Sequence, residues 1–482
     1  MMDGHVAPQD IQWLEEEFSK AKKGTSFILV THYPLKSGDV DNWYEVTDMA
    51  RRYNVKAILG GHYHTNRLFF YDGIPAFINR SNLRDKEDKT GGYSVYEINK
   101  DSIIVYEQKL NKSPKKWGGY SLNEKYYSED KSIYDRPSDS VNTIYPDVKE
   151  VWINKIGNSI YSSPELYNNR VYTTDDAGQV TCLSMTDGKI LWTFQSGKRI
   201  VGTPAAANGV IVFGSADKYI YGLDTEDGKL VWKYPAKEAV LGSVKIDGST
   251  AYIGASDHTM RAIDIITGKL LWEYPHVKGY IETKPLIYDN KVIFGAWDNN
   301  MYALDKNTGK LIWKWDGELT RMHFSPAAVW PVAAHGKVFF TAPDRVMTTL
   351  NAETGKTIWR TKESMVRETI GLSEDKNRIY SKTMQDSVVC YSAISDIPQR
   401  VWSSNVYYGY DHAPSMPVEK DNTLFGSTKN GIVFALDAKS GKLKWKHKIG
   451  NSLINTVLPL SGNSCLFTSS EGIVGLIRYN KE

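Results

Sequence analysis

Three histidines at the ends of apolar segments have the clearest potential for chemistry in this sequence. His62 and His64 close the segment "VKAILGGHYH", and His32 closes the segment "TSFILVTH". Neutral imidazole is a common ligand of transition metals. The pattern therefore predicts that His32, His62 and His64 bind metal. The alternative is that these histidines only cap strands or satisfy loop carbonyls.

The elements around the histidines indicate an α/β domain over residues 1–110. Ile11, Leu14 and Phe18 recur at helical spacing, and "NWYEVTDMARRYN" predicts a second helix between the two histidine segments. The histidine segments and three later segments predict strands, the later ones being "RLFFYDGIPAFINRS", "GGYSVYEIN" and "SIIVYEQKL". Active sites of α/β sheets lie where strands end, which is where the histidines fall.

The motifs "QWLEEE", "VTHYP" and "GGHYH" resemble, in order and spacing, the C-terminal half of the calcineurin-like metallophosphoesterase domain. The resemblance implies that His32 and His62 bind one ion of a pair of divalent ions (Mn, Fe or Zn) and that His64 binds the other. Such a pair would clamp a phosphate and deliver hydroxide in line with the leaving group.

The carboxylate motifs of that family have no match here. Its Asp-X-His, Gly-Asp and Gly-Asn-His motifs would precede the first helix, where this chain has nine residues. "GDVDNW" follows His32 and is interpreted as a turn, and His5 in "DGHV" does not fit a strand end. We therefore expect a partial domain with an incomplete metal pair, no assignable catalytic residue and negligible phosphoesterase turnover.

A forty-residue repeat organises the rest of the chain. Eight tryptophans follow one another at intervals of 40, 40, 40, 41, 46, 43 and 43 residues. They are Trp152, Trp192, Trp232, Trp272, Trp313, Trp359, Trp402 and Trp445. Six of them follow a Gly-Lys turn, as in "DGKLVW" and "TGKLLW". A period of this length is typical of propellers and other repeat folds.

Each repeat contains about four short strands. Alternating segments such as "YIYGLDT" precede the Gly-Lys turn, and apolar runs such as "GVIVFGS" precede those. The segment around Trp152 lacks three strands, and the three strands after Trp445 lack a fourth. Joining them closes the ring. The predicted fold is mainly β, an eight-bladed β-propeller over 148–482, after a connector at 111–147.

The repeat resembles the PQQ-like repeat of quinoprotein dehydrogenases and of the periplasmic outer-membrane assembly lipoprotein. Dehydrogenases of that kind hold the quinone with adjacent cysteines, which this chain lacks. Cys182 and Cys390 fall in a strand position that other repeats fill with Gly222, Ala262 or Ala435, so we interpret them as small core residues. We expect no PQQ, and we expect the tryptophans to be packing anchors between blades.

The segments that follow each Trp strand do not repeat, and we expect them to gather on one face of the propeller. A solvated rim of loops is the simpler interpretation. The alternative is a face that binds a protein or small molecule, because Arg and Tyr are enriched at binding sites. The candidate residues of this face are Arg199, Tyr280, Glu282, Arg321, His323, Arg367, Tyr408, Tyr410, Asp411 and His412.

Composition narrows the function classes. A net charge of +3 over 482 residues does not favour nucleic acid as a partner. No apolar run reaches the ~20 residues of a membrane span, and the propeller resemblance implies a periplasmic or extracellular location. Two hypotheses follow. One is a truncated, inactive metal-dependent phosphoesterase whose propeller binds substrate or a partner, and the alternative is a non-catalytic propeller scaffold.

Overall fold

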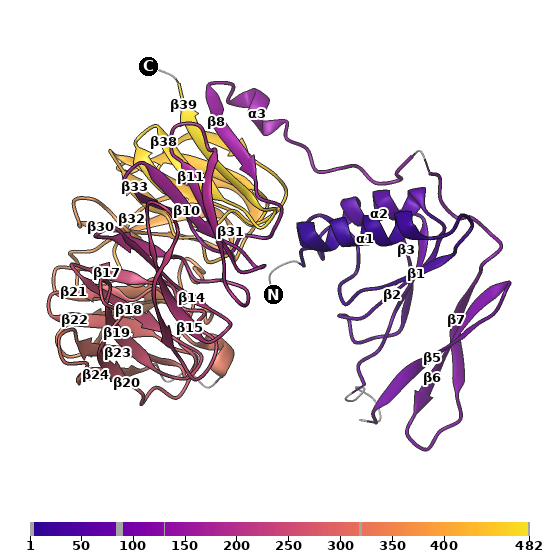
Figure 1. Ribbon diagram of the computed structural model, residues 1–482, viewed down its shortest axis with the longest axis horizontal. Coiled ribbons are helices and arrows are strands. Elements are labelled where there is room, and N and C mark those ends of the chain that lie inside the picture. The colour runs from indigo at the N-terminus through magenta and orange to yellow at the C-terminus, as the bar shows by residue number, and fades with distance from the viewer. Residues whose placement is uncertain (1–3, 83–89, 130, 318–320, 481–482) are drawn as a thin grey trace. The chain divides into compact units, whose positions relative to one another are not determined.

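The computed structural model describes residues 4–82, 90–129, 131–317 and 321–480. The chain divides into two compact units, Met1–Ser138 and Asp139–Glu482. Strands dominate, as predicted (Figure 1). Within the described residues, no helix combines the length and the apolar character that crossing a membrane requires.

The first unit is built on a mixed sheet with the order β1-β2-β4-β3. Its members are β1 (Phe27–Val30), β2 (Val55–Gly60), β3 (Arg67–Tyr71) and β4 (Ile74–Ile78). β1, β2 and β4 run parallel, and β3 pairs antiparallel with β4. The helices α1 (Pro8–Lys20) and α2 (Trp43–Arg52) cover one face. Phe18 and Met49 from these helices pack with Ile58 of the sheet.

A second, three-stranded sheet packs on the other side of the first. It contains β5 (Gly92–Ile98), β6 (Ser102–Lys109) and β7 (Lys115–Ser121). Phe77 of β4 packs with Ile103 and Val105 of β6. The ring of Tyr120 in β7 lies 5.1 Å from that of Phe77. The segment expected to be a connector therefore includes a strand near its start, whose half-buried aromatic residues stand among polar ones.

Three residues that follow β7 also pack against the sheets and helices of the first unit, namely Tyr127, Ser132 and Arg136. The Tyr127 hydroxyl donates to the Val55 carbonyl at 2.7 Å. Asp72 is fully buried, forms an ion pair with Arg51, and accepts a hydrogen bond from the Ser132 hydroxyl at 2.8 Å. The expected connector is thus largely part of the first unit, because buried polar partners hold it there.

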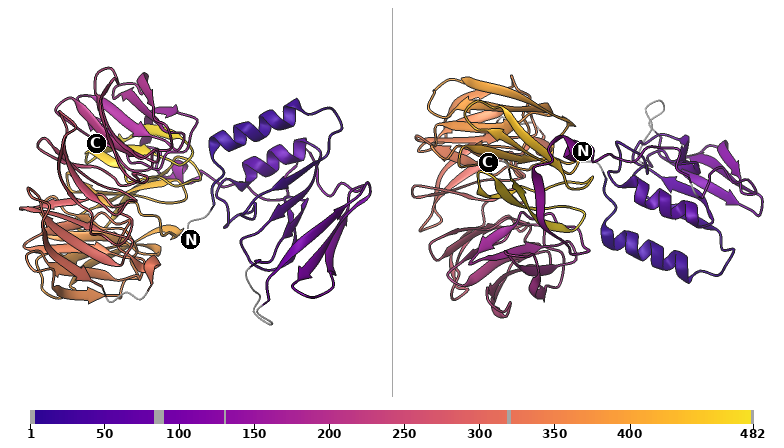
Figure 2. Two further views of the ribbon diagram at one scale, coloured as in Figure 1. Left: turned by 60° about the horizontal axis from the view of Figure 1, so that its bottom comes forward. Right: turned by 90° about the horizontal axis from the view of Figure 1, so that it is seen from above.

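Eight four-stranded antiparallel sheets make up the second unit (Figure 2). We number them in chain order, with the short α3 (Val141–Ile144) preceding β8. Sheets 1 and 2 comprise β9 (Glu165–Tyr167), β10 (Arg170–Thr174), β11 (Gln179–Ser184), β12 (Ile190–Gln195), β13 (Ala205–Ala207), β14 (Val210–Ser215), β15 (Tyr219–Asp224) and β16 (Leu230–Pro235). Sheets 3 and 4 comprise β17 (Lys245–Asp247), β18 (Thr250–Gly254), β19 (Met260–Asp264), β20 (Leu270–Tyr274), β21 (Leu286–Tyr288), β22 (Lys291–Gly295), β23 (Asn300–Asp305) and β24 (Leu311–Asp316).

The remaining sheets follow the same order. The 3-10 helix η1 (Met322–Phe324) precedes sheet 5. Sheets 5 and 6 comprise β25 (Val332–Ala334), β26 (Lys337–Thr341), β27 (Met347–Asn351), β28 (Thr357–Thr361), β29 (Gly371–Leu372), β30 (Arg378–Lys382), β31 (Gln385–Ser392) and β32 (Arg400–Tyr410). Sheets 7 and 8 comprise β33 (Val418–Lys420), β34 (Thr423–Ser427), β35 (Ile432–Asp437), β36 (Leu443–Lys448), β37 (Leu458–Ser461), β38 (Ser464–Thr468), β39 (Ile473–Tyr479) and β8 (Val148–Lys155).

Sheet 8 joins the two ends of the repeat region. β8 pairs with β39, and Trp152 lies opposite Leu476. The Thr468 hydroxyl of sheet 8 donates to the Ser162 carbonyl just before sheet 1 at 2.6 Å. The expected pairing of the Trp152 strand with the C-terminal strands is therefore present.

The repeated tryptophan packs between neighbouring sheets. In sheet 2, Trp232 lies opposite Gly222, where a Cβ atom would come within 2.3 Å of the indole. Its Nε1 donates to the Ile265 carbonyl of sheet 3 at 2.7 Å. Gly268 in the Gly-Lys turn of sheet 3 has φ +70, and a Cβ there would lie 2.6 Å from Trp232. Two of the repeat's fixed residues therefore contact each other across the sheet boundary, which confirms the packing role of the tryptophan.

The cysteines occupy the small-residue position opposite the tryptophan. Cys182 pairs with Trp192 and Cys390 with Trp402, and both thiols are fully buried. Burial raises the pKa of Cys182 to about 11 and that of Cys390 to about 12. The thiols therefore stay protonated at neutral pH and act as small core residues, as predicted.

Candidate functional site

Two of the three histidines proposed as metal ligands lie side by side in the first unit. Because β1 and β2 are parallel neighbours, His32 and His62 follow them at the same edge of the sheet. Their ring centroids are 5.6 Å apart. His62 and His64 have φ of 68° and 57°, a left-handed conformation that is uncommon outside glycine. The sheet topology thus brings together the two motifs that the sequence singled out.

The donor set around these histidines does not fit a two-metal centre. His64 is exposed, and the ring of His62 packs against that of Tyr33 at 4.4 Å. The nearby Asp39 carboxylate already pairs with Lys36 and accepts the Tyr63 hydroxyl at 2.6 Å. In the described ranges, no three His, Cys, Asp or Glu side chains are grouped so that they could hold a metal ion. Metal binding by His32, His62 and His64 stays a prediction.

In the second unit, one face carries the connections between sheets. Each sheet has four antiparallel strands, so the connection into its first strand, the turn between its second and third, and the exit from its fourth share one face. We call it the loop face. A carboxylate in the second turn accepts a backbone N–H from the preceding connection. The pairs are Asp217 with Gly197 at 2.8 Å, Asp257 with Lys237 at 3.0 Å, Asp298 with Lys278 at 3.0 Å and Glu471 with Asn451 at 2.8 Å.

Several candidate residues of this face are exposed. Arg199 is 57% exposed in its side chain and Tyr280 is 44% exposed. Arg321, which precedes η1, and His323 within η1 are both exposed. Glu282 is held by the Trp297 indole N–H at 2.8 Å. Arg367 is half-buried and pairs with Glu368 at 2.9 Å.

Three candidate residues of the face are buried instead. Tyr408, Asp411 and His412 are 4%, 2% and 4% exposed. In β32 the pairing register shifts, with Gln385 opposite Tyr410 but Ser387 opposite Asn405. This β-bulge turns Tyr408 inward, where its hydroxyl donates to the Ser387 carbonyl at 2.5 Å. Tyr408, Asp411 and His412 therefore hold the loop in place from inside. The expectation that their side chains face solvent on the loop face is wrong.

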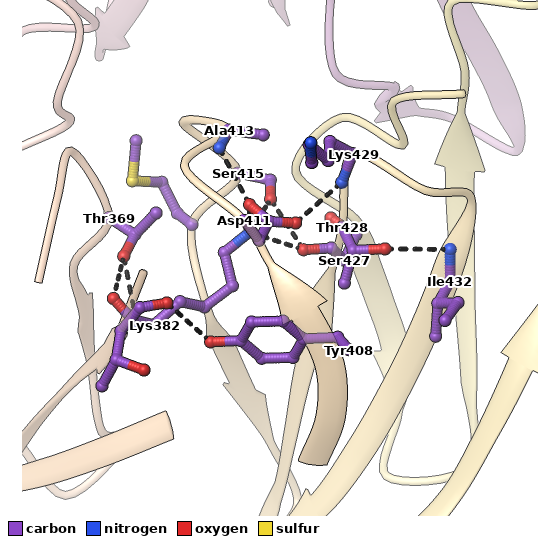
Figure 3. A network of polar contacts seen from close by, with 12 residues as sticks. Thr369, Lys382, Tyr408, Asp411, Ala413, Ser415, Ser427, Thr428, Lys429 and Ile432 are labelled. Carbon is purple, nitrogen blue, oxygen red and sulfur yellow. Dashed lines mark hydrogen bonds and ion pairs between the residues drawn. The ribbon is translucent and has the colours of Figure 1, made fainter. Parts of the chain in front are cut away.

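Asp411 and Lys382 form the centre of a buried polar network (Figure 3). Lys382 Nζ lies 3.2 Å from Asp411 Oδ1 and donates to the Ser415 hydroxyl at 2.8 Å and the Ser427 carbonyl at 2.7 Å. Asp411 Oδ2 accepts the Lys429 backbone N–H at 2.8 Å. Burial lowers the pKa of Lys382, and the Asp411 carboxylate opposes that shift. The network ties sheet 6 to sheet 7 beneath the loop face.

Lys382 was not singled out from the sequence. It ends the second strand of its sheet, where sheets 1, 2 and 8 have Thr174, Ser215 and Thr468. A lysine in a position otherwise filled by small residues is the signal that a repeat-by-repeat alignment would have shown.

A second group of charges lies at the inner strands. Glu165 accepts the Ala206 N–H at 3.1 Å, and Lys284 Nζ lies 4.8 Å from the centre of the Trp330 ring. Burial raises the pKa of Glu165, while the Lys284 and Lys245 ammonium groups lower it. Burial lowers the pKa of Lys284. These three charges interact across sheets 1, 3 and 4.

Comparison with known proteins agrees with this architecture. The chain resembles BamB from Moraxella catarrhalis, with 17% identity and a TM-score of 0.57 over 69% of this chain and 100% of that one. It also resembles Sqt1 of Saccharomyces cerevisiae, with 14% identity and a TM-score of 0.59 over 68% and 98%. A quinohemoprotein alcohol dehydrogenase from Comamonas testosteroni gives 12% identity and a TM-score of 0.57 over 72% and 78%. At such identities the likeness shows the fold alone.

A search of curated protein sequences found no match. The family model described as outer membrane protein assembly factor BamB matches residues 139–279, 285–390 and 385–482, which is more than half of the chain. The chain therefore belongs to the PQQ-like repeat family described as outer membrane protein assembly factor BamB.

Proposed function

We propose that this chain is a non-catalytic binding protein whose second unit holds a protein partner on its loop face. We take its eight sheets as one closed, eight-bladed propeller. One observation carries the proposal. The connections of the loop face are fixed by the same carboxylate contact in several sheets, while the exposed side chains they carry differ from sheet to sheet. A rigid frame with variable exposed residues is the arrangement of a recognition surface.

The family supports a partner that is a protein. Its description refers to the assembly of outer membrane proteins, which favours a macromolecular partner and a location outside the cytoplasm. Exposed Arg199, Tyr280 and Arg321 belong to the residue types that dominate binding energy at protein interfaces. We therefore assign the partner contact to the loop face rather than to the outer edges of the sheets.

A photo-crosslinking residue placed at single positions tests this assignment. Met322 on the loop face is 57% exposed, and Leu191 on the outer strand β12 is 48% exposed. We expect the Met322 probe to trap one discrete partner in extracts of cells that express the chain. The Leu191 probe should trap none, and changing Arg321 and Arg367 together to Ala should abolish trapping at Met322. Equal trapping at Leu191 would contradict the proposal.

Metal-dependent phosphoesterase activity is the second candidate function. The adjacency of His32 and His62 at the end of parallel strands favours it. The lack of a grouped carboxylate among the described residues argues for negligible turnover in this chain. Aryl-phosphate hydrolysis with added manganese measures it, and turnover that disappears in His62→Ala would establish the enzyme.

A further inference from the structure

A cavity of about 490 Å³ lies where sheets 5 and 6 meet. Arg345, Met365, Met384, Val389, Arg400 and Tyr410 are among the residues that line it. Its volume is within the range of about 300–1,000 Å³ of pockets that bind ligands. None of the first five residues belongs to the loop-face set expected from the sequence.

Sheet 6 departs from the repeat in two places, and one of them lies at this cavity. Its Gly-Lys turn is replaced by "ISDIP", which does not line the cavity. The bulge of β32 places Tyr410 at the cavity, and its side chain is 46% exposed. The bulge therefore helps to build the cavity.

The backbone around the cavity is strained in several places. Arg345, Met365 and Asp386 have φ of 68°, 49° and 61°. Non-glycine residues in this region cost free energy and persist where the surrounding structure holds them, commonly at functional sites. Asp386 is held because its carboxylate accepts the Gly409 N–H at 2.6 Å. Lys218, His258 and Asn299 have the same conformation in the corresponding turns of sheets 2, 3 and 4, so the conformation of Arg345 is a regular feature of the repeat.

One positive charge of the cavity is uncompensated. Arg400 pairs with Glu363 at 2.9 Å. Arg345 is exposed, and its guanidinium makes no hydrogen bond or ion pair with any residue the structure describes. The neighbouring Asp344 pairs with Arg360 instead, at 2.8 Å. A free guanidinium presents a planar fork of donors that matches a carboxylate.

The exposed apolar surface of the cavity comes from two side chains. Met365 is 38% exposed and Tyr410 46%, whereas Met384 and Val389 are buried at 7% and 2%. Apart from the two arginines, the other lining residues are polar, namely Glu363, Ser364, Thr383, Gln385, Ser387 and Ser403. Methionine adapts its shape to different ligand side chains, and tyrosine is enriched among residues that dominate binding. The cavity thus combines one free cation with the adjustable side chain of Met365 and the ring of Tyr410.

We propose that this cavity binds an extended acidic segment of a partner protein. A carboxylate side chain of the segment pairs with Arg345, and a neighbouring apolar side chain packs on Met365 and Tyr410. One charge-assisted hydrogen bond raises the association constant about 10- to 100-fold. A Kd of 1 mM corresponds to a factor of about 1,000 relative to the 1 M standard state. The carboxylate alone therefore falls short, and the ligand needs the attached apolar group. The inference rests on the proposed function, because it names the partner chemistry of one part of the loop face.

The test uses the whole chain and an array of nine-residue peptides. Each peptide has a central Asp or Glu flanked by randomised positions, and its partner on the array carries Asn, Gln or Lys at the centre. We expect wild type to prefer acidic peptides that have Leu, Met or Phe next to the acid. Arg345→Glu should weaken their binding about 10- to 100-fold, the loss of one charge-assisted bond, and should raise binding of the Lys peptides. Met365→Ser should weaken binding without changing the preference for acid.

Arg478→Glu is the matched control, since Arg478 is an exposed arginine near the end of β39 that lies away from the loop face. Unchanged acid preference in Arg345→Glu would overturn the inference, and so would an equal loss in Arg478→Glu. Absence of any peptide binding would overturn it too. The proposed function fails separately, by the crosslinking result at Met322. An unchanged thermal unfolding curve shows that each exposed substitution leaves the fold intact.

Discussion

Trp43 of the first unit and Trp232 of the second are both nearly buried, at 3% and 9% exposure, but they are held differently. Trp43 packs against Tyr134, with ring centroids 5.8 Å apart, and under the guanidinium of Arg136 at 5.0 Å. Among the described residues, these contacts are not part of a pattern repeated along the chain. Trp232 donates to a carbonyl of the next sheet and covers the glycine of that sheet's turn. Other sheets repeat the same contact, for example Trp272 with Lys306 and Gly309.

This difference predicts which amino-acid substitutions each unit tolerates. Because one contact is copied around the second unit, its loops can diverge while the frame stays constant. The first unit depends on single buried groups such as Arg51 and Asp72, so one substitution there has no copy to compensate for it. Each prediction below tests one side of this comparison.

The largest effect is expected for Trp232→Ala. Truncating a buried tryptophan typically costs about 3–5 kcal/mol in the free energy of unfolding, and here the bond to Ile265 is lost as well. Thermal unfolding combined with hydrogen exchange should show the loss in the second unit, with the first unit unchanged. Trp13→Ala is the control, since Trp13 is 60% exposed, and it should cost less than about 0.5 kcal/mol. An equal loss of unfolding free energy in Trp232→Ala and Trp13→Ala would contradict the packing role of Trp232.

Asp72→Asn should destabilise the first unit by about 3 kcal/mol, because it leaves the buried Arg51 charge without its fully buried partner. Chemical denaturation followed by a probe in the first unit measures the loss. Glu15→Gln removes an exposed ion pair in the same unit, in which Arg52 lies 3.5 Å from Glu15, and should change little. A loss smaller than that of the control would contradict the importance of the buried pair.

His412 should make the second unit sensitive to acid. Burial, together with the Arg367 and Lys429 charges, lowers the pKa of His412 to about 4. The unfolded chain therefore takes up the proton first as the pH falls, so the contribution is present above about pH 6.5 and is lost towards pH 4. The free energy of unfolding of wild type relative to His412→Gln should fall by about 2–3 kcal/mol over that range. Parallel curves for the two proteins would refute the assignment.

The smallest effect concerns a single hydrogen bond between sheets. The Thr203 hydroxyl accepts the Ser163 N–H at 3.0 Å, and the Ser243 hydroxyl accepts the Thr203 N–H at 3.1 Å. Thr203→Val removes only the first bond and should cost about 1 kcal/mol. Thr186→Val, at an exposed turn position, is the control and should be neutral within about 0.5 kcal/mol. Indistinguishable midpoints in urea would show that the bond contributes nothing.

The repeat made most of the second unit predictable from the sequence. The Trp spacing, the Gly-Lys turn and the small residue opposite the tryptophan are visible because they recur. β7 was missed because Lys and Gly surround its two aromatic residues, and only Phe77 of another strand reveals their buried side.

The candidate site was less predictable. The two histidine motifs meet because parallel strands end together, which a pattern of strand and helix can show. The inward turn of Tyr408 depends on a bulge, and a bulge changes the alternation of sides without an obvious signal in one sequence. Among the residues that the structure describes, Arg345 is left unpaired, because Asp344 pairs with Arg360. Glu363 likewise pairs with Arg400. These pairings depend on distances in the folded chain, which the sequence does not give.

The pairing of β8 with β39 has a consequence for folding during translation. Roughly 320 residues separate these two strands. At about 5–20 residues per second, β8 is made tens of seconds before its partner exists. Throughout that time β8 is a nascent strand without its partner, and the order of synthesis makes sheet 8 the last of the described sheets to be completed.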